Sequence, residues 1–289
     1  MSATASAVAA GASGTAAGAA VRAVVPDTGR GGVTALRVVH SEWIKFRSLR
    51  STWCTLLAAT VAMIGFGALI CWVTVDHWAR LPQDERLAFS PAGQSLKGFY
   101  LAQLAIGVLG VLVVTGEYAT GAIRSTLAAV PRRVPVLLAK AGVFGAVTLA
   151  VTGVACPAAF LLGQSVLAGQ HLGTGLAAPG VLRVVLGTPL YLTAVGLLAV
   201  GVGSLVRSTA GGVATVLGLL LVLPVLAQVL PGSWRDHIFP YLPGPAGQAL
   251  TTLHAQPSAL APWPGFALLC GYAAAALAAG ALLLRHRDA

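Results

Sequence analysis

The chain has 289 residues, of which 57% are hydrophobic and 9% charged, and its formal net charge is +10. Soluble domains carry about 25% charged residues, so this composition excludes a water-soluble globule and leaves a multi-pass membrane bundle. The basic residues stand beside apolar runs, which is typical of topology signals and argues against a nucleic-acid partner. The surplus of Arg, Ala and Gly is typical of a GC-rich bacterial genome, so we expect a bacterial plasma membrane protein.

The first 32 residues consist mainly of Ala, Gly, Ser and Thr. No basic residue precedes Arg22, and Gly and Ser interrupt the apolar stretch, so the pattern does not fit a secretory signal peptide. We expect a disordered cytoplasmic tail over residues 1–32 and a membrane domain over residues 33–289.

Residues 34–52 predict a short amphipathic helix before the first span. Lys45 falls on its polar side, and the apolar side predicts contact with the headgroup layer of the membrane. The alternative is an ordinary basic flank of the first span. Four apolar residues recur at helical spacing and form the membrane-facing stripe: Leu36, Val39, Trp43 and Phe46.

Six apolar runs are long enough to cross a hydrocarbon core roughly 30 Å thick. Prolines inside three of these runs are tolerated in a bundle, because neighbouring helices satisfy the freed carbonyls. Lys140 stands in the first turns of the third run, from which its long side chain is expected to reach the cytoplasmic surface. The predicted spans are residues 53–75, 98–115, 136–162, 184–206, 211–230 and 265–284.

The basic residues predict the orientation of the six spans. A cytoplasmic amino terminus places thirteen of the eighteen Lys and Arg residues inside and five outside. The positive-inside rule therefore favours both termini in the cytoplasm. In this orientation residues 231–264, a Pro-rich apolar loop with Trp234, Tyr241 and Trp263, lie outside. We expect re-entrant structure there rather than a floppy surface loop.

Several chemistries have no support in the sequence. It contains neither GxxxxGK[ST] nor HExxH, and its four cysteines lack metal-binding spacing. We therefore expect no enzyme activity, bound cofactor or metal in this chain. The predicted spans contain no Asp or Glu, whereas ion-coupled transporters keep ionisable groups near the membrane midplane.

Two segments carry a family resemblance: SEWIKFRSLRSTW at residues 41–53 and GEYATGAIRSTLAAVPRR at residues 116–133. With six spans, they resemble the permease subunits of ATP-binding-cassette exporters of the ABC-2 type. The likeness covers residues 34–289, and Ala122 replaces the Thr that is usual in the family. The second segment matches the family pattern at Glu117, Tyr118, Gly121, Arg124, Leu127 and Pro131.

The resemblance implies an ATP-driven exporter permease that pairs with a second permease copy and with a separate ABC ATPase, which binds the ATP. Residues 116–133 would then dock on that ATPase as a short helix, with Glu117, Gly121 and Arg124 along one side. Two other classes stay open: a stand-alone secondary transporter or channel, and a non-transporting immunity or sensor protein. The composition and the six apolar runs predict an all-α integral membrane fold in each case.

Overall fold

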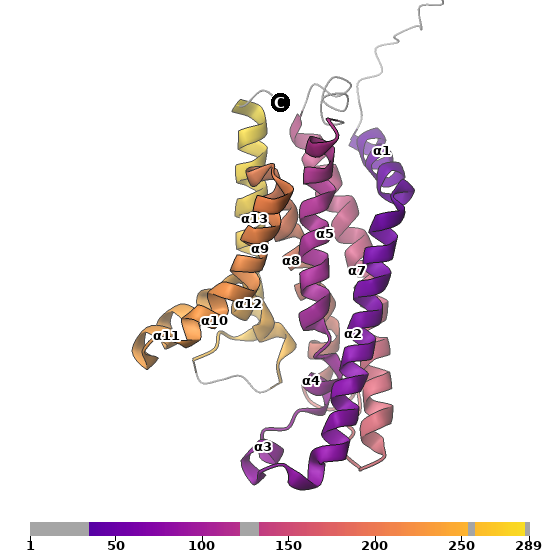
Figure 1. Cartoon of the computed structure of the whole chain (residues 1–289), viewed down its shortest axis with the longest axis vertical. Helices are drawn as coiled ribbons and strands as arrows, with labels where there is room; N and C mark the ends of the chain where they lie inside the picture. Colours follow the sequence, from indigo (N-terminus) through magenta and orange to yellow (C-terminus); the bar gives the residue numbers. More distant parts are fainter. Residues whose placement is uncertain (1–34, 122–132, 254–257, 287–289) are drawn as a thin grey trace, which may run out of the picture. The chain divides into compact units, whose positions relative to one another are not determined.

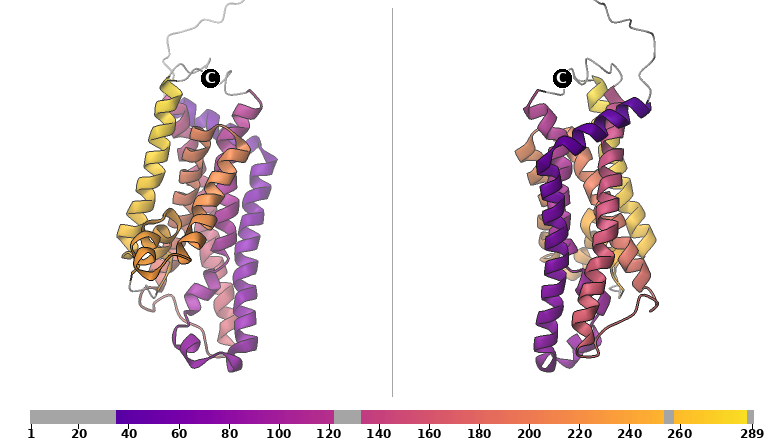
Figure 2. Two further views of the ribbon diagram at one scale, coloured as in Figure 1. Left: turned by 60° about the vertical axis from the view of Figure 1, so that its left-hand side comes forward. Right: turned by 90° about the vertical axis from the view of Figure 1, so that its right-hand side faces the viewer.

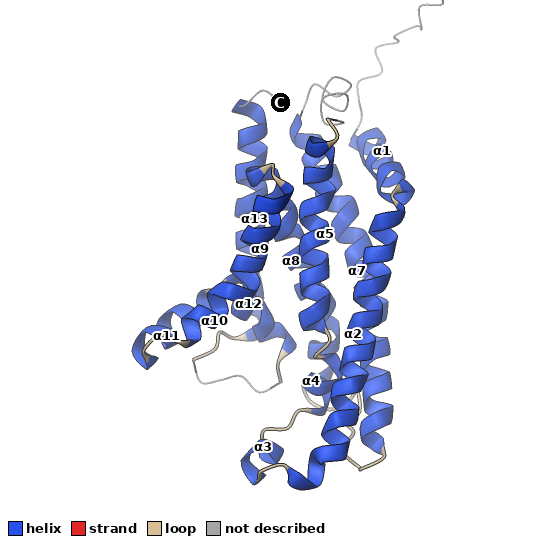
Figure 3. Cartoon of the chain, in the orientation of Figure 1, coloured by secondary structure: helices blue, strands red, loops and turns tan. Residues whose placement is uncertain are grey.

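The computed structural model describes residues 35–121, 133–253 and 258–286. Within these ranges the chain is helical and has no strand, and six segments are long and apolar enough to cross a membrane (Figures 1 and 3). The predicted tail, residues 1–32, lies outside the described residues. The six segments are Arg50–Arg80, Pro91–Ala119, Val134–Ala168, Val181–Val206, Thr209–Gln228 and Pro262–Arg285.

The described elements follow one another in this order. They are α1 (Ala35–Ser48), α2 (Arg50–His77), η1 (Trp78–Arg80), α3 (Gln83–Leu87), α4 (Pro91–Leu96), α5 (Phe99–Ala119), α7 (Arg133–Ala168), α8 (Val181–Val206), α9 (Thr209–Leu217), η2 (Gly218–Val222), α10 (Leu223–Gln228), α11 (Gly232–Ile238), η3 (Phe239–Tyr241), α12 (Pro243–Gln248), η4 (Ala249–Thr251) and α13 (Pro262–His286).

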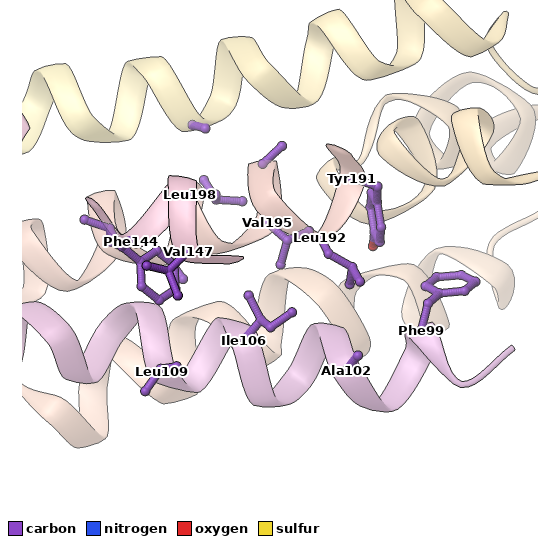
Figure 4. Packing of buried hydrophobic residues seen from close by; sticks show 14 of the residues in the cluster. Phe99, Ala102, Ile106, Leu109, Phe144, Val147, Tyr191, Leu192, Val195 and Leu198 are labelled. Carbon is purple, nitrogen blue, oxygen red and sulfur yellow. The ribbon is translucent and has the colours of Figure 1, made fainter. Parts of the chain in front are cut away.

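Helix α8 is the centre of the bundle, because it packs against α5, α7 and α13. In the apolar stretch of α8, 78% of the residues are buried inside the bundle. The corresponding share for α13 is 22%, because this helix contacts the bundle along one side only. Close-packed side chains fill the space between α5, α7 and α8, among them Ile106, Phe144 and Val195 (Figure 4). Helix α1 runs obliquely across one end of the bundle and packs on α7 (Figure 2). We call this the α1 end.

The second span differs from its predicted bounds. It consists of α4 and α5 with a break at Lys97–Gly98, and α5 continues to Ala119. A Cβ atom at Gly98 would lie 1.9 Å from the carbonyl oxygen of Met63, so only glycine permits this approach to α2. The extension of α5 brings Glu117 into a span, which corrects the prediction that the spans lack carboxylates.

The fifth span is not one regular helix. Residues Gly218–Val222 form a π-helical turn between α9 and α10. Pro224 lacks the amide hydrogen that would bond to the carbonyl of Leu220, and its ring crowds that carbonyl, so the turn widens just before the proline. Helices α7 and α8 continue through Pro157 and Pro189 without such a change.

The loop between α10 and α13 contains ordered elements. Helix α11 is exposed along its whole length, whereas α12 and η4 are largely buried against α8 and α13. Trp234 on α11 is 64% exposed, and Leu250 on η4 is fully buried. The connection between α10 and α13 therefore has a solvent-exposed half, α11, and a buried half, α12 with η4.

Candidate functional site

Four charged side chains meet at the α1 end. Lys140 of α7 donates hydrogen bonds to Glu42 of α1, with Nζ 2.7 Å from Oε2, and to Glu117 of α5, with Nζ 2.8 Å from Oε1. Lys45 of α1 reaches the same two carboxylates, at 2.7 Å from Glu42 Oε1 and 3.3 Å from Glu117 Oε1. We call these four residues the ion-pair network. Two carboxylates and two ammonium groups balance its charge and join three helices.

Three of the four side chains are removed from solvent. The exposed fraction is 3% for Glu42, 9% for Lys140 and 14% for Glu117, while Lys45 keeps 39%. A buried charge is costly unless it is paired, and loss of one partner leaves the other uncompensated. Lys140 is therefore the central member, because it is the buried cation that pairs with both carboxylates.

The sequence of α1 explains why Glu42 turns inward. Val38, Glu42 and Phe46 are spaced four residues apart and lie on one face of the helix. Val38 packs in a small apolar cluster with residues of α7, and the Phe46 ring lies 6.3 Å from that of Phe144, edge to face. These apolar contacts stand on either side of Glu42 and bury its carboxylate.

The electrostatics of the two α1 members follow from this packing. Burial raises the pKa of Glu42, but the ammonium groups of Lys140 and Lys45 outweigh it, so the net pKa lies below its ordinary value. Burial lowers the pKa of Lys45, but the carboxylates of Glu42 and Glu117 outweigh it and raise that pKa overall. Both groups therefore stay ionised across the neutral range.

A second contact fixes the end of α5 to the other side of the bundle. The guanidinium of Arg207, at the end of α8, lies 5.4 Å from the centre of the Tyr118 ring. Arg207 Nη2 also donates to the carbonyl of Leu283 on α13, at 3.3 Å. Neighbouring residues of α5 thus contact opposite sides of the bundle. Glu117 pairs with side chains of α1 and α7, and Tyr118 contacts Arg207, which bonds to α13.

The structure brings together only part of the predicted docking segment. Glu117 and Tyr118 lie in the last turn of α5, and Gly121, with a φ of 70°, follows the end of that helix. The helical stacking expected from Glu117 through Gly121 is therefore wrong, because a left-handed residue ends a helix. Three predicted residues lie outside the described ranges: Arg124, Leu127 and Pro131.

The predicted stripe of α1 is divided in the structure. Leu36, Val39 and Trp43 are exposed, but Phe46 is 5% exposed and packs inside the bundle. Phe46 was assigned to the membrane face because it shares helical spacing with Trp43. That spacing also fits the inward face through Glu42, and packing against Phe144 decides between them.

The sequence interpretation missed three members of the network. The sequence predicts that Lys140 reaches the cytoplasmic surface and that Lys45 lies on the polar side of α1, but it does not predict that both pair with buried carboxylates. Two signals were available: Glu42 is the one acidic residue of α1, and Lys140 is the one charge inside its apolar run. Neither signal identifies a partner, because the network joins residues up to 98 positions apart.

No cluster of three or more His, Cys, Asp or Glu side chains that could bind a metal occurs in the described part of the chain. The chemistry of the site is thus that of ion pairs between helices, which position elements. Neither a protein-family model nor a curated protein matches the sequence.

Proposed function

We propose that this chain is the membrane-spanning permease subunit of an ATP-driven exporter. A second permease copy would complete the transport pathway, and a separate ATPase would bind and hydrolyse ATP at the α1 end. The chain would lie in a bacterial plasma membrane with both termini in the cytoplasm. The six apolar segments and the family likeness of residues 41–53 and 116–133 support this proposal.

The ion-pair network is the observation that carries the proposal. Residues 122–132 connect α5 to α7, and the network joins Glu117 just before this connection to Lys140 just after it. Glu42 adds α1 to the same cluster. A segment that receives force from a partner must be attached firmly to the spans it moves. Buried, charge-assisted hydrogen bonds at both of its ends meet that requirement.

Two finer features belong to the same proposal. Helix α1 would lie in the headgroup layer, with Leu36, Val39 and Trp43 toward lipid and the exposed Arg37 and Arg47 toward anionic headgroups. A spin label at Val39 should then be more accessible to oxygen, which partitions into lipid, than to a water-soluble nickel chelate. The opposite ranking would contradict this placement.

The second feature is a re-entrant outer segment made of α11, η3, α12 and η4. The burial of α12 and η4 against α8 and α13 supports it, because irregular backbone at membrane depth needs protein around it. The fully exposed α11 would lie at the outer membrane surface, where Trp234 suits the interface.

One observation favours a second candidate, an ion-coupled transporter that works alone. Glu117 Oε2 is buried and has no hydrogen-bond partner among the described residues, as a proton-accepting oxygen would. Its place in the last turn of α5 and its pairing with Lys140 weigh against this candidate. Transport by the purified chain under a proton gradient alone, abolished in Glu117→Gln, would favour it.

The proposal is tested by isolating the full chain from its native membrane under mild conditions. We expect a P-loop ATPase to co-purify, and Glu117→Gln to reduce transport-linked ATPase stimulation several-fold while the complex still assembles. Glu85→Gln is the matched control, because Glu85 is an exposed acid on α3. Failure to recover any ATPase, or equal stimulation in both variants, would contradict the proposal.

A further inference from the structure

A second polar cluster lies near the opposite end of α5. The hydroxyl of Tyr191, on α8, donates to Gln103 Oε1 of α5 at 2.5 Å and accepts from Gln248 Nε2 of α12 at 3.3 Å. Tyr191 is fully buried, and its ring meets that of Phe99 edge to face (Figure 4). We call Gln103, Tyr191 and Gln248 the relay. It joins α12 to the two most tightly packed spans.

Helix α12 and the following η4 each make a further contact with α8. A Cβ atom at Gly247 would lie 2.7 Å from the Tyr191 ring, so the α12 backbone rests directly on that side chain. Arg183, in the first turn of α8, donates to the carbonyls of Leu250 at 3.2 Å and Thr252 at 2.9 Å. Movement of α8 therefore acts on α12 through Tyr191 and on the adjoining η4 through Arg183.

Helices α5 and α8 are in backbone contact between the two polar clusters. A Cβ atom at Gly110 would lie 2.7 Å from the carbonyl oxygen of Gly196, and one at Gly203 would lie 3.2 Å from the backbone of Val111. Because glycine has no side chain, the two helix backbones pack directly against each other at these positions. The Gln103–Tyr191 bond and the Tyr118–Arg207 contact fasten the pair at both ends.

The two clusters are connected by one continuous helix. Gln103 and Glu117 are 14 residues apart on α5, which corresponds to about 21 Å and nearly four whole turns. They consequently lie within about 40° of each other around the helix axis, since four turns span about 14.4 residues. One end of α5 is held by the ion-pair network, and the other by the relay.

We propose that α5 and α8 form a rigid pair that transmits movement from the ion-pair network to α12, and that Tyr191 is the positioning residue through which it arrives. This inference rests on the proposed function, in which the α1 end receives force from the ATPase and α12 belongs to the re-entrant outer segment. A shift of Glu117 moves α5 along its axis, α8 follows, and the Tyr191 hydroxyl loses or keeps its bond to Gln248. The state of this bond sets whether α12 is held or released.

The test is hydrogen–deuterium exchange of the full chain in nanodiscs, followed over residues 243–252. Tyr191→Phe keeps the ring but removes the hydroxyl, and should speed exchange several-fold in this segment. Tyr100→Phe is the matched control, because the half-exposed Tyr100 hydroxyl makes no hydrogen bond among the described residues. Its exchange should equal that of the unmodified chain.

The remote variant is Glu117→Gln, with Glu85→Gln as its control. We expect Glu117→Gln to speed exchange over residues 243–252 as well, and to add nothing in the Tyr191→Phe background, where the connection is already cut. If Glu117→Gln prevents folding, Glu117→Asp shortens the same side chain and serves instead. Unchanged exchange over residues 243–252 in the Glu117 variant, or full additivity with Tyr191→Phe, would overturn the inference.

This experiment needs no ATPase and no substrate. Absence of a co-purifying ATPase would remove the proposed function but leave the exchange result standing. If an ATPase is recovered but Glu117→Gln leaves exchange over residues 243–252 unchanged, only the inferred transmission through α5 and α8 is overturned.

Discussion

The ion-pair network and the relay solve the same problem with different chemistry. Both use buried polar groups to join helices, and both include α5, but one is fully charged and the other neutral. The network lies at the end of the bundle, where Lys45 still reaches solvent. In the relay the buried Tyr191 ring packs on Phe99, and amides and a hydroxyl cost far less to bury than ions. Buried ions thus need charged partners between helices, whereas neutral groups need only hydrogen bonds.

The difference predicts unequal responses to the loss of one partner. Lys140→Met leaves the Glu42 carboxylate buried with only Lys45 beside it, so we expect a destabilisation of about 3–5 kcal/mol. Thermal unfolding in nanodiscs would measure it, with the exposed Lys97→Met as control. Adding Glu42→Gln should recover part of the loss. A single variant as stable as its control would show that the network contributes no stability.

The relay should be more tolerant. Gln103→Leu removes the acceptor of the Tyr191 hydroxyl and leaves a buried donor unsatisfied, which costs about 1–3 kcal/mol. Combining it with Tyr191→Phe removes both polar partners, so the double variant should be nearly as stable as Tyr191→Phe alone. The same unfolding measurement applies. A loss from Gln103→Leu larger than that from Lys140→Met would reverse the ranking of the two clusters.

Lowering the pH should reduce the stability contributed by the ion-pair network but not that contributed by the relay. We expect this effect to be smaller than those of the substitutions above. Because the folded pKa of Glu42 lies below the ordinary 4.5, its contribution is complete above about pH 4.5 and is lost as the pH falls through the folded value. For Lys45 the folded pKa lies above 10.5, so its contribution is lost only as the pH rises beyond that value. Glu42 and Lys45 should therefore contribute constant stability between these limits.

The measurement is the melting temperature against pH for the unmodified chain, Glu42→Gln and Tyr191→Phe. Glu42→Gln should flatten the decline below pH 4.5. Tyr191→Phe should lower the curve without changing its acid slope, because the relay carries no charge there. An unchanged acid slope in Glu42→Gln would mean that this carboxylate does not stabilise the fold.

The same contrast explains what the sequence could predict. Six spans follow from apolar runs, since the length of an apolar helix is a local property. The π-helical turn at Gly218–Val222 depends on local proline chemistry, but its exact form depends on packing. Partners are not local: Lys140 alone reads as a surface-seeking lysine, and only the approach of α1 and α5 makes it a buried cation.

Individual side chains show most clearly what could not be predicted from the sequence. Phe46 and Trp43 are both aromatic and lie three residues apart, but only Phe46 packs against aromatic rings inside the bundle. Gln103 and Tyr191 gave no signal at all, because an isolated amide or phenol inside an apolar run has no pattern. Spacing predicts which residues share a face, and tertiary contact decides what that face meets.

The central claim, that the α1 end of a permease meets an ATPase, is tested most directly by photocrosslinking in native membranes. A photoreactive residue would replace Ser208, which is close to Arg207 at the α1 end, or Gln83, which is exposed on α3. We predict that the Ser208 position yields an adduct with a P-loop ATPase and that the Gln83 position yields none. An ATPase adduct from Gln83 alone, or no ATPase adduct from either position, would contradict the account.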